Sequence, residues 1–97
     1  MKKRFVLAGD VGGTNARFAI FELGKTPRLV RQDVLESRSF RSFASALERF
    51  LGAKPEPIAA ATFGIAGPVV EQKVKTTNLP WTVDARAISK GFAIPRV

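Results

Sequence analysis

A glycine-rich segment near the start of the chain, residues 9–15 (GDVGGTN), holds the residue types best suited to chemistry. The adjacent Gly12 and Gly13 lack side-chain bulk and permit positive φ, so the backbone can turn tightly and come close to a ligand. Successive backbone amides in such a turn can form a concavity that binds anions. Thr14 adds a hydroxyl donor, and Asn15 adds an amide that can brace the turn. The segment is therefore a candidate anion-binding loop.

Asp10, at the end of the apolar run before these glycines, can hold Mg²⁺ directly or through water, as a nucleotide phosphate usually requires. The same residue types are also common in plain hairpin turns, where Gly-Gly joins two strands and Asp and Asn are frequent. Two established phosphate motifs are missing, because neither Gly-x4-Gly-Lys-Ser/Thr nor Gly-x-Gly-x-x-Gly occurs in the sequence. A phosphate loop of another kind and a simple hairpin turn both remain open.

Two later segments give weaker signals. Residues 64–68 (GIAGP) follow an apolar run, where α/β sheets often place ligands, although a tight strand exit would use the same glycines. In residues 77–81 (TNLPW), Asn78 could bond sugar hydroxyls while Trp81 covers an apolar sugar face. Alternatively, Trp81 is a core anchor and Asn78 forms a turn.

The composition excludes several other chemistries. The 97 residues include no Cys, His or Tyr, so the chain can form no disulfide, no cysteine-based zinc site and no histidine triad or base. Any chemistry must use carboxylates, hydroxyls, amines, backbone amides or a bound metal. The length suits one domain or part of one.

The charge and hydropathy patterns point to a soluble protein. The 16 Lys and Arg exceed the 8 Asp and Glu to give a net charge of +8, but only residues 2–4 form a basic run, which makes nucleic acid an unlikely partner. The apolar run after them stops at Asp10, before the ~7 residues that a secretion signal needs. The longest uncharged stretch, residues 58–70, is shorter than the ~20 residues of a spanning helix. We expect a cytoplasmic protein without a membrane partner.

The elements that must position the candidate site begin with three strands. Residues 4–9, 16–23 and 28–36 have the apolar or alternating character of strands and are joined by short turns, which predicts an antiparallel meander. In the second strand, the side chains of Ala16, Phe18 and Ile20 should lie on one face, opposite those of residues 17, 19 and 21.

A helix and a further strand follow. The helical spacing of apolar residues from Phe40 to Leu51 predicts a buried helix face, with Ser39 or Ser42 as N-cap and Gly52 as the stop. Residues 58–63 (IAAATF) are apolar enough for a central strand covered on both faces, and a tight loop should begin at residue 64.

The last third of the chain is predicted to hold shorter elements. Residues 69–75 should form a short hairpin or strand, and residues 76–81 a loop. Asp84 should cap a second helix that Gly91 ends. Residues 95–97 have the character of the start of another strand. The order predicts an α/β fold, a mixed sheet with an initial antiparallel β-meander and flanking helices.

These motifs together resemble the N-terminal lobe of the bacterial glucokinase family, within the superfamily of sugar kinases, heat-shock chaperones and actin. The resemblance rests on GDVGGTNARFAIF (9–21), GIAGPV (64–69) and TNLPW (77–81), in this order, and extends over essentially the whole chain. It implies the N-terminal part of a ribonuclease-H-like, actin-like ATPase lobe. Residues 1–97 should then form a single, incomplete lobe.

The resemblance also implies roles for individual residues. The first loop would cradle the phosphates of ATP, with Asp10 near Mg²⁺ through water and Thr14 donating to a phosphate oxygen; its residues are Gly9, Asp10, Val11, Gly12, Gly13 and Thr14. The sugar side of the cleft would be formed by Gly64, Ala66, Gly67, Pro68 and Asn78. In complete family members, ATP phosphorylates the 6-hydroxyl of glucose, largely through positioning and electrostatic stabilisation.

One family feature has no counterpart here. In the family that the chain resembles, the carboxylate that accepts the hydroxyl proton lies in an Asn-Asp-Phe segment just after a Pro-Arg-Val sequence, and here Pro95-Arg96-Val97 are the last three residues. We therefore assign no catalytic residue and expect the chain alone to be inactive.

Two alternatives stay open, a non-catalytic sugar-sensing regulator and a basic module that binds acidic partners. The basic module would form a stable, monodisperse fold. We instead expect an exposed sheet edge and unburied Phe side chains to promote association, which leaves a homo-oligomer open.

Overall fold

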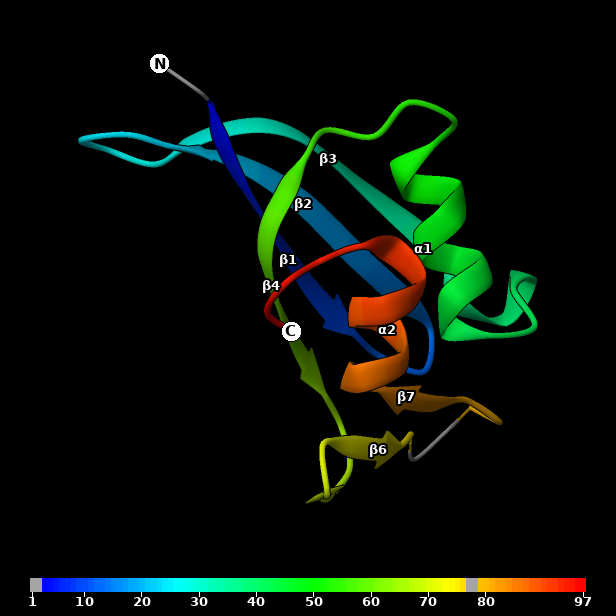
Figure 1. Cartoon of the computed structure of the whole chain (residues 1–97). Helices are drawn as coiled ribbons and strands as arrows, with labels where there is room; N and C mark the ends of the chain where they lie inside the picture. The colour runs from blue at the N-terminus through cyan, green and yellow to red at the C-terminus, as the bar shows by residue number, and fades with distance from the viewer. Residues whose placement is uncertain (1–2, 77–78) are drawn as a thin grey trace.

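The computed structural model describes residues 3–76 and 79–97 as two sheets and two helices (Figure 1). The elements in chain order are β1 (Arg4–Val11), β2 (Asn15–Leu23), β3 (Arg28–Glu36), the 3₁₀ helix η1 (Ser37–Ser39), α1 (Phe43–Leu51), β4 (Ile58–Ile65), β5 (Val69–Val70), β6 (Lys73–Lys75), β7 (Thr82–Asp84) and α2 (Ala85–Phe92). The mixed α/β architecture predicted from the sequence is confirmed.

The larger sheet has the strand order β3-β2-β1-β4. Its first three strands form the predicted antiparallel meander, and β4 lies parallel to β1. The strand β1 continues beyond the predicted end at residue 9, because Asp10 pairs with Arg17 and the buried Val11 pairs with Ala16. The predicted turn of residues 10–15 is correspondingly shorter, and only residues 12–14 lie outside the two strands.

The strand β4 differs from its prediction in length and position. It runs through Gly64 to Ile65, because its parallel pairing with β1 continues to the end of that strand, so the tight loop does not begin at residue 64. It is also an edge strand of the described sheet rather than a covered central one, and Thr62 and Gly64 are exposed. On its outer side, the Ala61 N–H donates to the Arg96 carbonyl at 2.8 Å, in a single parallel bridge at the predicted strand start.

The N-cap of helix α1 is Ser42 and not Ser39. The Ser42 hydroxyl accepts from the Ser45 N–H, and the Ser45 hydroxyl accepts from the Ser42 N–H, so both donors at the helix start are satisfied. Phe40 lies before the helix but still packs against the core. Gly52 ends the helix with φ 78°, a conformation that favours glycine.

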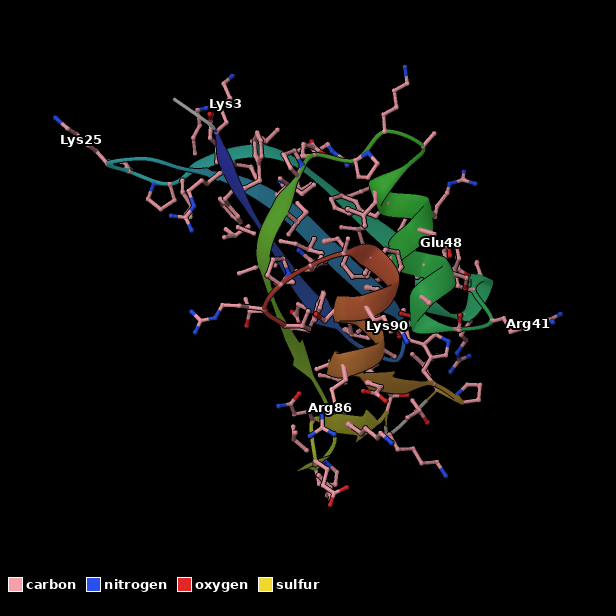
Figure 2. All side chains as sticks on the ribbon, in the orientation of Figure 1. Lys3, Lys25, Arg41, Glu48, Arg86 and Lys90 are labelled. Carbon is pink, nitrogen blue, oxygen red and sulfur yellow. The ribbon has the colours of Figure 1, made fainter. Side chains whose placement is uncertain are left out.

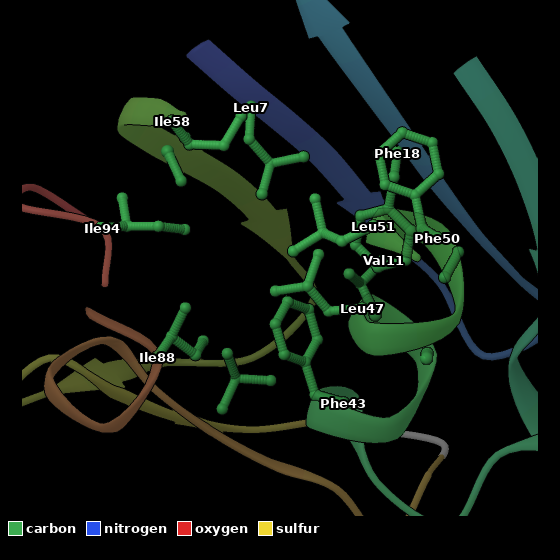
Figure 3. Close-up of a cluster of buried hydrophobic side chains, with 14 of the residues drawn as sticks. Leu7, Val11, Phe18, Phe43, Leu47, Phe50, Leu51, Ile58, Ile88 and Ile94 are labelled. Carbon is green, nitrogen blue, oxygen red and sulfur yellow. The ribbon is translucent and has the colours of Figure 1, made fainter. Parts of the chain in front are cut away.

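Both helices cover one face of the larger sheet and enclose the core (Figures 1 and 3). Ala16, Phe18 and Ile20 of β2 lie on this face and are almost fully buried, as the alternation predicts. The Phe18 ring lies 5.8 Å from the Phe43 ring in an edge-to-face arrangement and 5.5 Å from the Phe50 ring, measured between centroids. The predicted unburied phenylalanines are wrong, since all eight Phe side chains are buried or half-buried.

The smaller sheet has the order β5-β6-β7. The hairpin of β5 and β6 confirms the prediction for residues 69–75, and it turns at Glu71 and Gln72, whose φ angles are 50° and 64°. The strand β7 was not predicted. It pairs with β6 through Val74 and Val83, and three residues are too few to give a periodicity signal.

The helix α2 begins as predicted and ends later. The Asp84 carboxylate caps it by accepting from the N–H groups of Arg86 and Ala87. Gly91 lies inside the helix, whose last residue is Phe92 and whose C-cap, Ala93, has the left-handed conformation. The Ile94 N–H then donates to the Ser89 carbonyl at 2.9 Å, so hydrogen bonding and not glycine sets the end. Neither helix of the described chain is long and apolar enough to cross a membrane.

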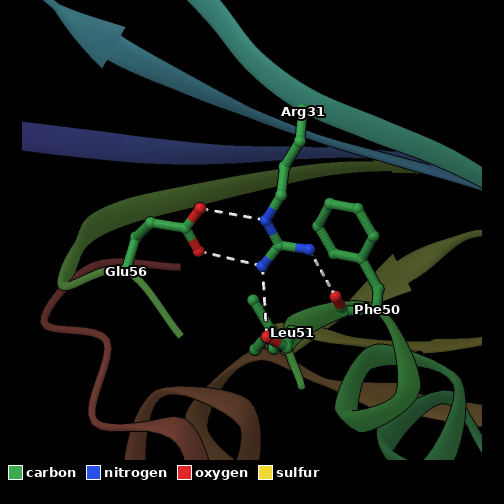
Figure 4. A network of polar contacts seen from close by, with 4 residues as sticks. All are labelled: Arg31, Phe50, Leu51 and Glu56. Atoms are coloured by element: carbon green, nitrogen blue, oxygen red, sulfur yellow. Dashed lines mark hydrogen bonds and ion pairs between the residues drawn. The ribbon is translucent and has the colours of Figure 1, made fainter. Parts of the chain in front are cut away.

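Arg31 of β3 ties the C-terminus of α1 to the sheet (Figure 4). Its guanidinium donates to both carboxylate oxygens of Glu56 at 2.9 Å, and to the carbonyls of Phe50 at 2.6 Å and Leu51 at 3.1 Å. It also lies 4.6 Å from the centre of the Phe50 ring. The hydrogen bonds from Arg31 lower the pKa of Glu56, and those to Glu56 raise the pKa of Arg31.

Replacing Arg31 by Met should therefore lower the free energy of unfolding by about 1–3 kcal/mol, because the Glu56 carboxylate and two helix carbonyls lose a half-buried partner. The control is Arg28→Met, which removes an arginine whose side chain is 65% exposed and pairs with Glu22. The Arg28→Met control should lower the free energy of unfolding much less, since exposed ion pairs contribute little to stability. Urea denaturation measures both losses, and equal losses would contradict the assigned role of Arg31.

Candidate functional site

The candidate site lies at one edge of the larger sheet, where the parallel strands β1 and β4 both end. Asp10 pairs with Gly64 and Val11 with Ile65, so the two strands leave the sheet side by side. The loop of residues 12–14 follows β1, and residues 66–68 follow β4. The topology thus brings together two of the three segments that the sequence singled out, at the kind of edge where α/β sheets bind ligands.

The loop of residues 12–14, here called the glycine loop, is held by hydrogen bonds to Asn15 and Ser37. The Gly12 N–H donates to the Asn15 carbonyl at 2.9 Å, and the carbonyls of Gly12 and Thr14 accept hydrogen bonds from Ser37. The N–H groups of Gly13 and Thr14 have no hydrogen-bond partner among the described residues. Two adjacent backbone donors are therefore available at the tip of the loop, an arrangement suited to an anion.

Neither backbone strain nor crowding requires glycine at position 12. Positive φ angles occur at Gly52 and Gly67 and not at Gly12. A Cβ placed on Gly12 would have the Asn15 carbonyl oxygen as its nearest neighbour, at 3.4 Å, which is an ordinary contact. Apart from that oxygen, the space around this position is open, so a ligand could approach the backbone of the loop there.

Gly9 and Val11, also predicted for this site, face the core. A Cβ on Gly9 would lie 2.6 Å from the Phe63 ring and 3.1 Å from the Phe18 ring, so packing alone requires glycine there. The Val11 side chain is almost fully buried. Gly9 and Val11 could therefore contact a ligand only through their backbone atoms.

Asp10 lies between Gly9 and Val11 in the sequence, so its side chain is on the opposite, exposed face of β1. Its Oδ1 is 4.0 Å from the place that a Cβ on Gly64 would take, so glycine leaves the space beside the carboxylate open. Within residues 3–76 and 79–97, no group of three or more acidic or histidine side chains could hold a metal ion. A single carboxylate suits Mg²⁺, which keeps several waters and takes its other ligands from phosphates.

The second loop is shaped by its own hairpin. Gly67 has φ 143°, and a Cβ on it would lie 2.7 Å from the Lys75 carbonyl oxygen, so glycine is required by the fold. Ala66 and Pro68 on either side of it are exposed beside the end of β4. Asn78, the remaining residue predicted for the sugar side, lies outside the described residues.

Trp81 is a core residue, so its interpretation as the cover of a sugar face is wrong. Its side chain is 1% exposed, and its ring lies edge-to-face against the Phe43 ring at 6.3 Å. Its indole N–H donates to the Phe40 carbonyl at 3.2 Å. A single Trp in a polar loop gives no sequence signal that separates these two roles.

Ser37 is the residue at this site that sequence reasoning missed. It is fully buried at the start of η1 and contacts the glycine loop through both its backbone and its hydroxyl. A serine after a strand is ordinary, and only the β2–β3 register, in which Asn15 pairs with Glu36, brings it under the loop.

The excess of positive charge is spread over the molecule. Lys25, Arg41 and Arg86 project in different directions from the turn after β2, the segment before α1 and the helix α2 (Figure 2). No single element gathers them, so the arrangement gives little support to a basic module for acidic partners.

Comparison with known proteins finds matches over most of the chain. The family model described as Glucokinase matches residues 7–97. A glucokinase of Ralstonia nicotianae is 41% identical over 93 residues, which cover 89% of this chain and 27% of the relative. A glucokinase of Nostoc punctiforme is 33% identical over 95 residues, covering 95% of this chain and 28% of the relative. The chain thus spans about a quarter of the length of these relatives.

A solved structure shows the same fold. The crystal structure of a glucokinase from an Antarctic psychrotroph superimposes with a TM-score of 0.77 at 26% sequence identity. The match covers 95% of this chain and 30% of that one. The sheet and the two helices therefore have the fold of part of a known glucokinase structure.

Proposed function

The chain belongs to the glucokinase family, and from this we propose that it supplies the phosphate-binding loop of an enzyme that transfers the γ-phosphoryl group of ATP to the 6-hydroxyl of glucose. The observation that carries the proposal is the pair of unpartnered N–H groups of Gly13 and Thr14, in the loop that follows Asp10 and its open carboxylate. Phosphoryl transfer depends mainly on positioning and charge stabilisation, which backbone donors and a metal-associated carboxylate provide.

In the proposed enzyme, the N–H groups of Gly13 and Thr14 donate to phosphate oxygens, and the Thr14 hydroxyl adds a third donor. Asp10 would hold Mg²⁺ through water, and this ion would neutralise charge on the phosphates when bound. The segment from Gly64 to Pro68 lies beside the phosphate loop and would line the sugar side of the cleft. Asn78 would contribute on the same side.

We further propose that the residue accepting the proton of the 6-hydroxyl lies outside residues 1–97, and that the enzyme acts in the cytoplasm. In this proposal Asp10 serves the metal and the phosphates, and the sequence resemblance implies that the family's base follows a Pro-Arg-Val sequence like that of residues 95–97. The chain by itself would then hold half of a nucleotide site and no complete active site.

The test is a coupled assay that follows glucose 6-phosphate formation from ATP and glucose, run on the 97-residue chain and on the whole protein that carries it. The whole protein should be active with Mg²⁺ and the 97-residue chain inactive. No activity of the whole protein would contradict the proposed reaction, and strong activity of the short chain would contradict the placement of the base.

A further inference from the structure

The hydroxyl of Ser37 is buried next to the glycine loop. The residue is 0% exposed, and its Oγ donates to the Gly12 carbonyl at 2.8 Å. Burying a hydroxyl is costly unless it is hydrogen-bonded, so this bond fixes where the side chain points. A structural role within η1 would not by itself direct the hydroxyl toward the loop.

The backbone of Ser37 holds the other end of the loop. Its N–H donates to the Thr14 carbonyl at 2.9 Å, as an extension of the pairing between Asn15 and Glu36. The carbonyls of Gly12 and Thr14 are therefore both bonded to the same residue. The loop is fixed from its inner side at two points.

These bonds determine which way the free donor points. A peptide unit is planar and trans, so the carbonyl of one residue and the N–H of the next point in opposite directions. With the Gly12 carbonyl directed at the Ser37 hydroxyl, the Gly13 N–H must point away from Ser37. Without that hydroxyl, the carbonyl of the half-buried Gly12 would lose its partner, and the Gly12–Gly13 peptide could rotate.

We infer that Ser37 is a positioning residue, whose hydroxyl orients the Gly12–Gly13 peptide so that the Gly13 N–H faces a phosphate group. The inference rests on the proposed phosphate-binding role of the glycine loop. Ser37 itself contacts no phosphate, and its effect on the ligand is transmitted through the loop backbone. Nucleotide binding should depend on it, and sugar binding should not.

The experiment compares Ser37→Ala with Ser39→Ala in the whole protein, measuring the KM values for ATP and glucose. Ser39 is the matched control, because it lies in the same 3₁₀ helix but is exposed. Ser37→Ala should raise the KM for ATP about fivefold, the effect of one lost hydrogen bond, and leave the KM for glucose unchanged. Ser37→Thr, which keeps the hydroxyl, should restore most of the ATP affinity.

An unchanged KM for ATP in Ser37→Ala, or equal increases for both substrates, would overturn the inference. A measurement on the unmodified protein covers the case in which the variants do not fold. With ¹⁵N-labelled protein, added inorganic triphosphate should shift the amide signal of Gly13 much more than that of Gly12, whose N–H is bonded to Asn15. A larger shift for the Gly12 amide than for the Gly13 amide would also overturn the inference.

These readouts separate the inference from the proposed reaction. If the protein does not phosphorylate glucose but binds triphosphate with the Gly13 signal shifted, and Ser37→Ala weakens that binding, the reaction is wrong and the inference stands. If it phosphorylates glucose while Ser37→Ala leaves the KM for ATP unchanged, only the inference is wrong. A protein that binds neither ATP nor triphosphate overturns both.

Discussion

Replacing Gly12 by Ala should lower kcat/KM for ATP about 100-fold while leaving the fold intact. A methyl group at this position meets no protein atom closer than the Asn15 carbonyl oxygen at 3.4 Å, and Gly12 has no positive φ, so the chain can accommodate it. It would, however, occupy the space through which phosphates approach the N–H groups of Gly13 and Thr14. Displacing a reacting group by about 1 Å can cost a factor of this size.

The matched control for this variant is Gly24→Ala, in the turn between β2 and β3. That glycine also has an open environment, with the Thr26 carbonyl oxygen at 3.8 Å, but lies at the other end of these strands. Steady-state kinetics with varied ATP, together with circular dichroism of both variants, measure the effect. Equal activity in the two variants would contradict the account of Gly12.

Replacing Asp10 by Asn should lower kcat about 10–100-fold and raise the Mg²⁺ concentration needed for half-maximal activity. The amide keeps the size of the side chain but removes the charge that would hold the metal through water. Asp10 is exposed beside Gly64, so the fold should not depend on its charge. Titration of activity with Mg²⁺ at saturating ATP and glucose measures both effects.

Asp33→Asn is the control for the loss of one negative charge. Asp33 is an exposed residue of β3 whose Oδ1 accepts from the Val34 N–H, a bond that asparagine can keep. This variant should retain normal activity and Mg²⁺ dependence. If Asp10→Asn behaved in the same way, Asp10 would have no part in metal binding.

Local signals in the sequence predicted the strands of the meander and the starts of both helices. Alternation placed Phe18 in the core and Arg17 on the outer face, and the Ser42 and Asp84 caps mark the starts of both helices. Glycines were less reliable as signals of helix ends. Gly91 was expected to end α2 but lies inside it, and the C-cap is Ala93, whose N–H donates to the Ser89 carbonyl. A glycine signals conformational freedom, and whether the fold uses it depends on neighbouring residues.

Features that depend on distant pairing could not be predicted. The parallel register of β1 and β4, which sets Gly64 beside Asp10, joins segments far apart in the chain. The hydrogen bond between Ser37 and Gly12 likewise follows from the register of β2 and β3. Whether Trp81 faces solvent or core depends on Phe43 of another element. Local patterns carry no information on such contacts, which tertiary packing decides.

The central claim is that the glycine loop binds nucleotide phosphates, and a crystal structure of the whole protein with Mg²⁺ and a non-hydrolysable ATP analogue tests it most directly. We predict phosphate oxygens within hydrogen-bond distance of the N–H groups of Gly13 and Thr14, with the metal ion between the phosphates and the Asp10 carboxylate. Phosphates bound elsewhere, with both N–H groups facing solvent, would contradict the claim.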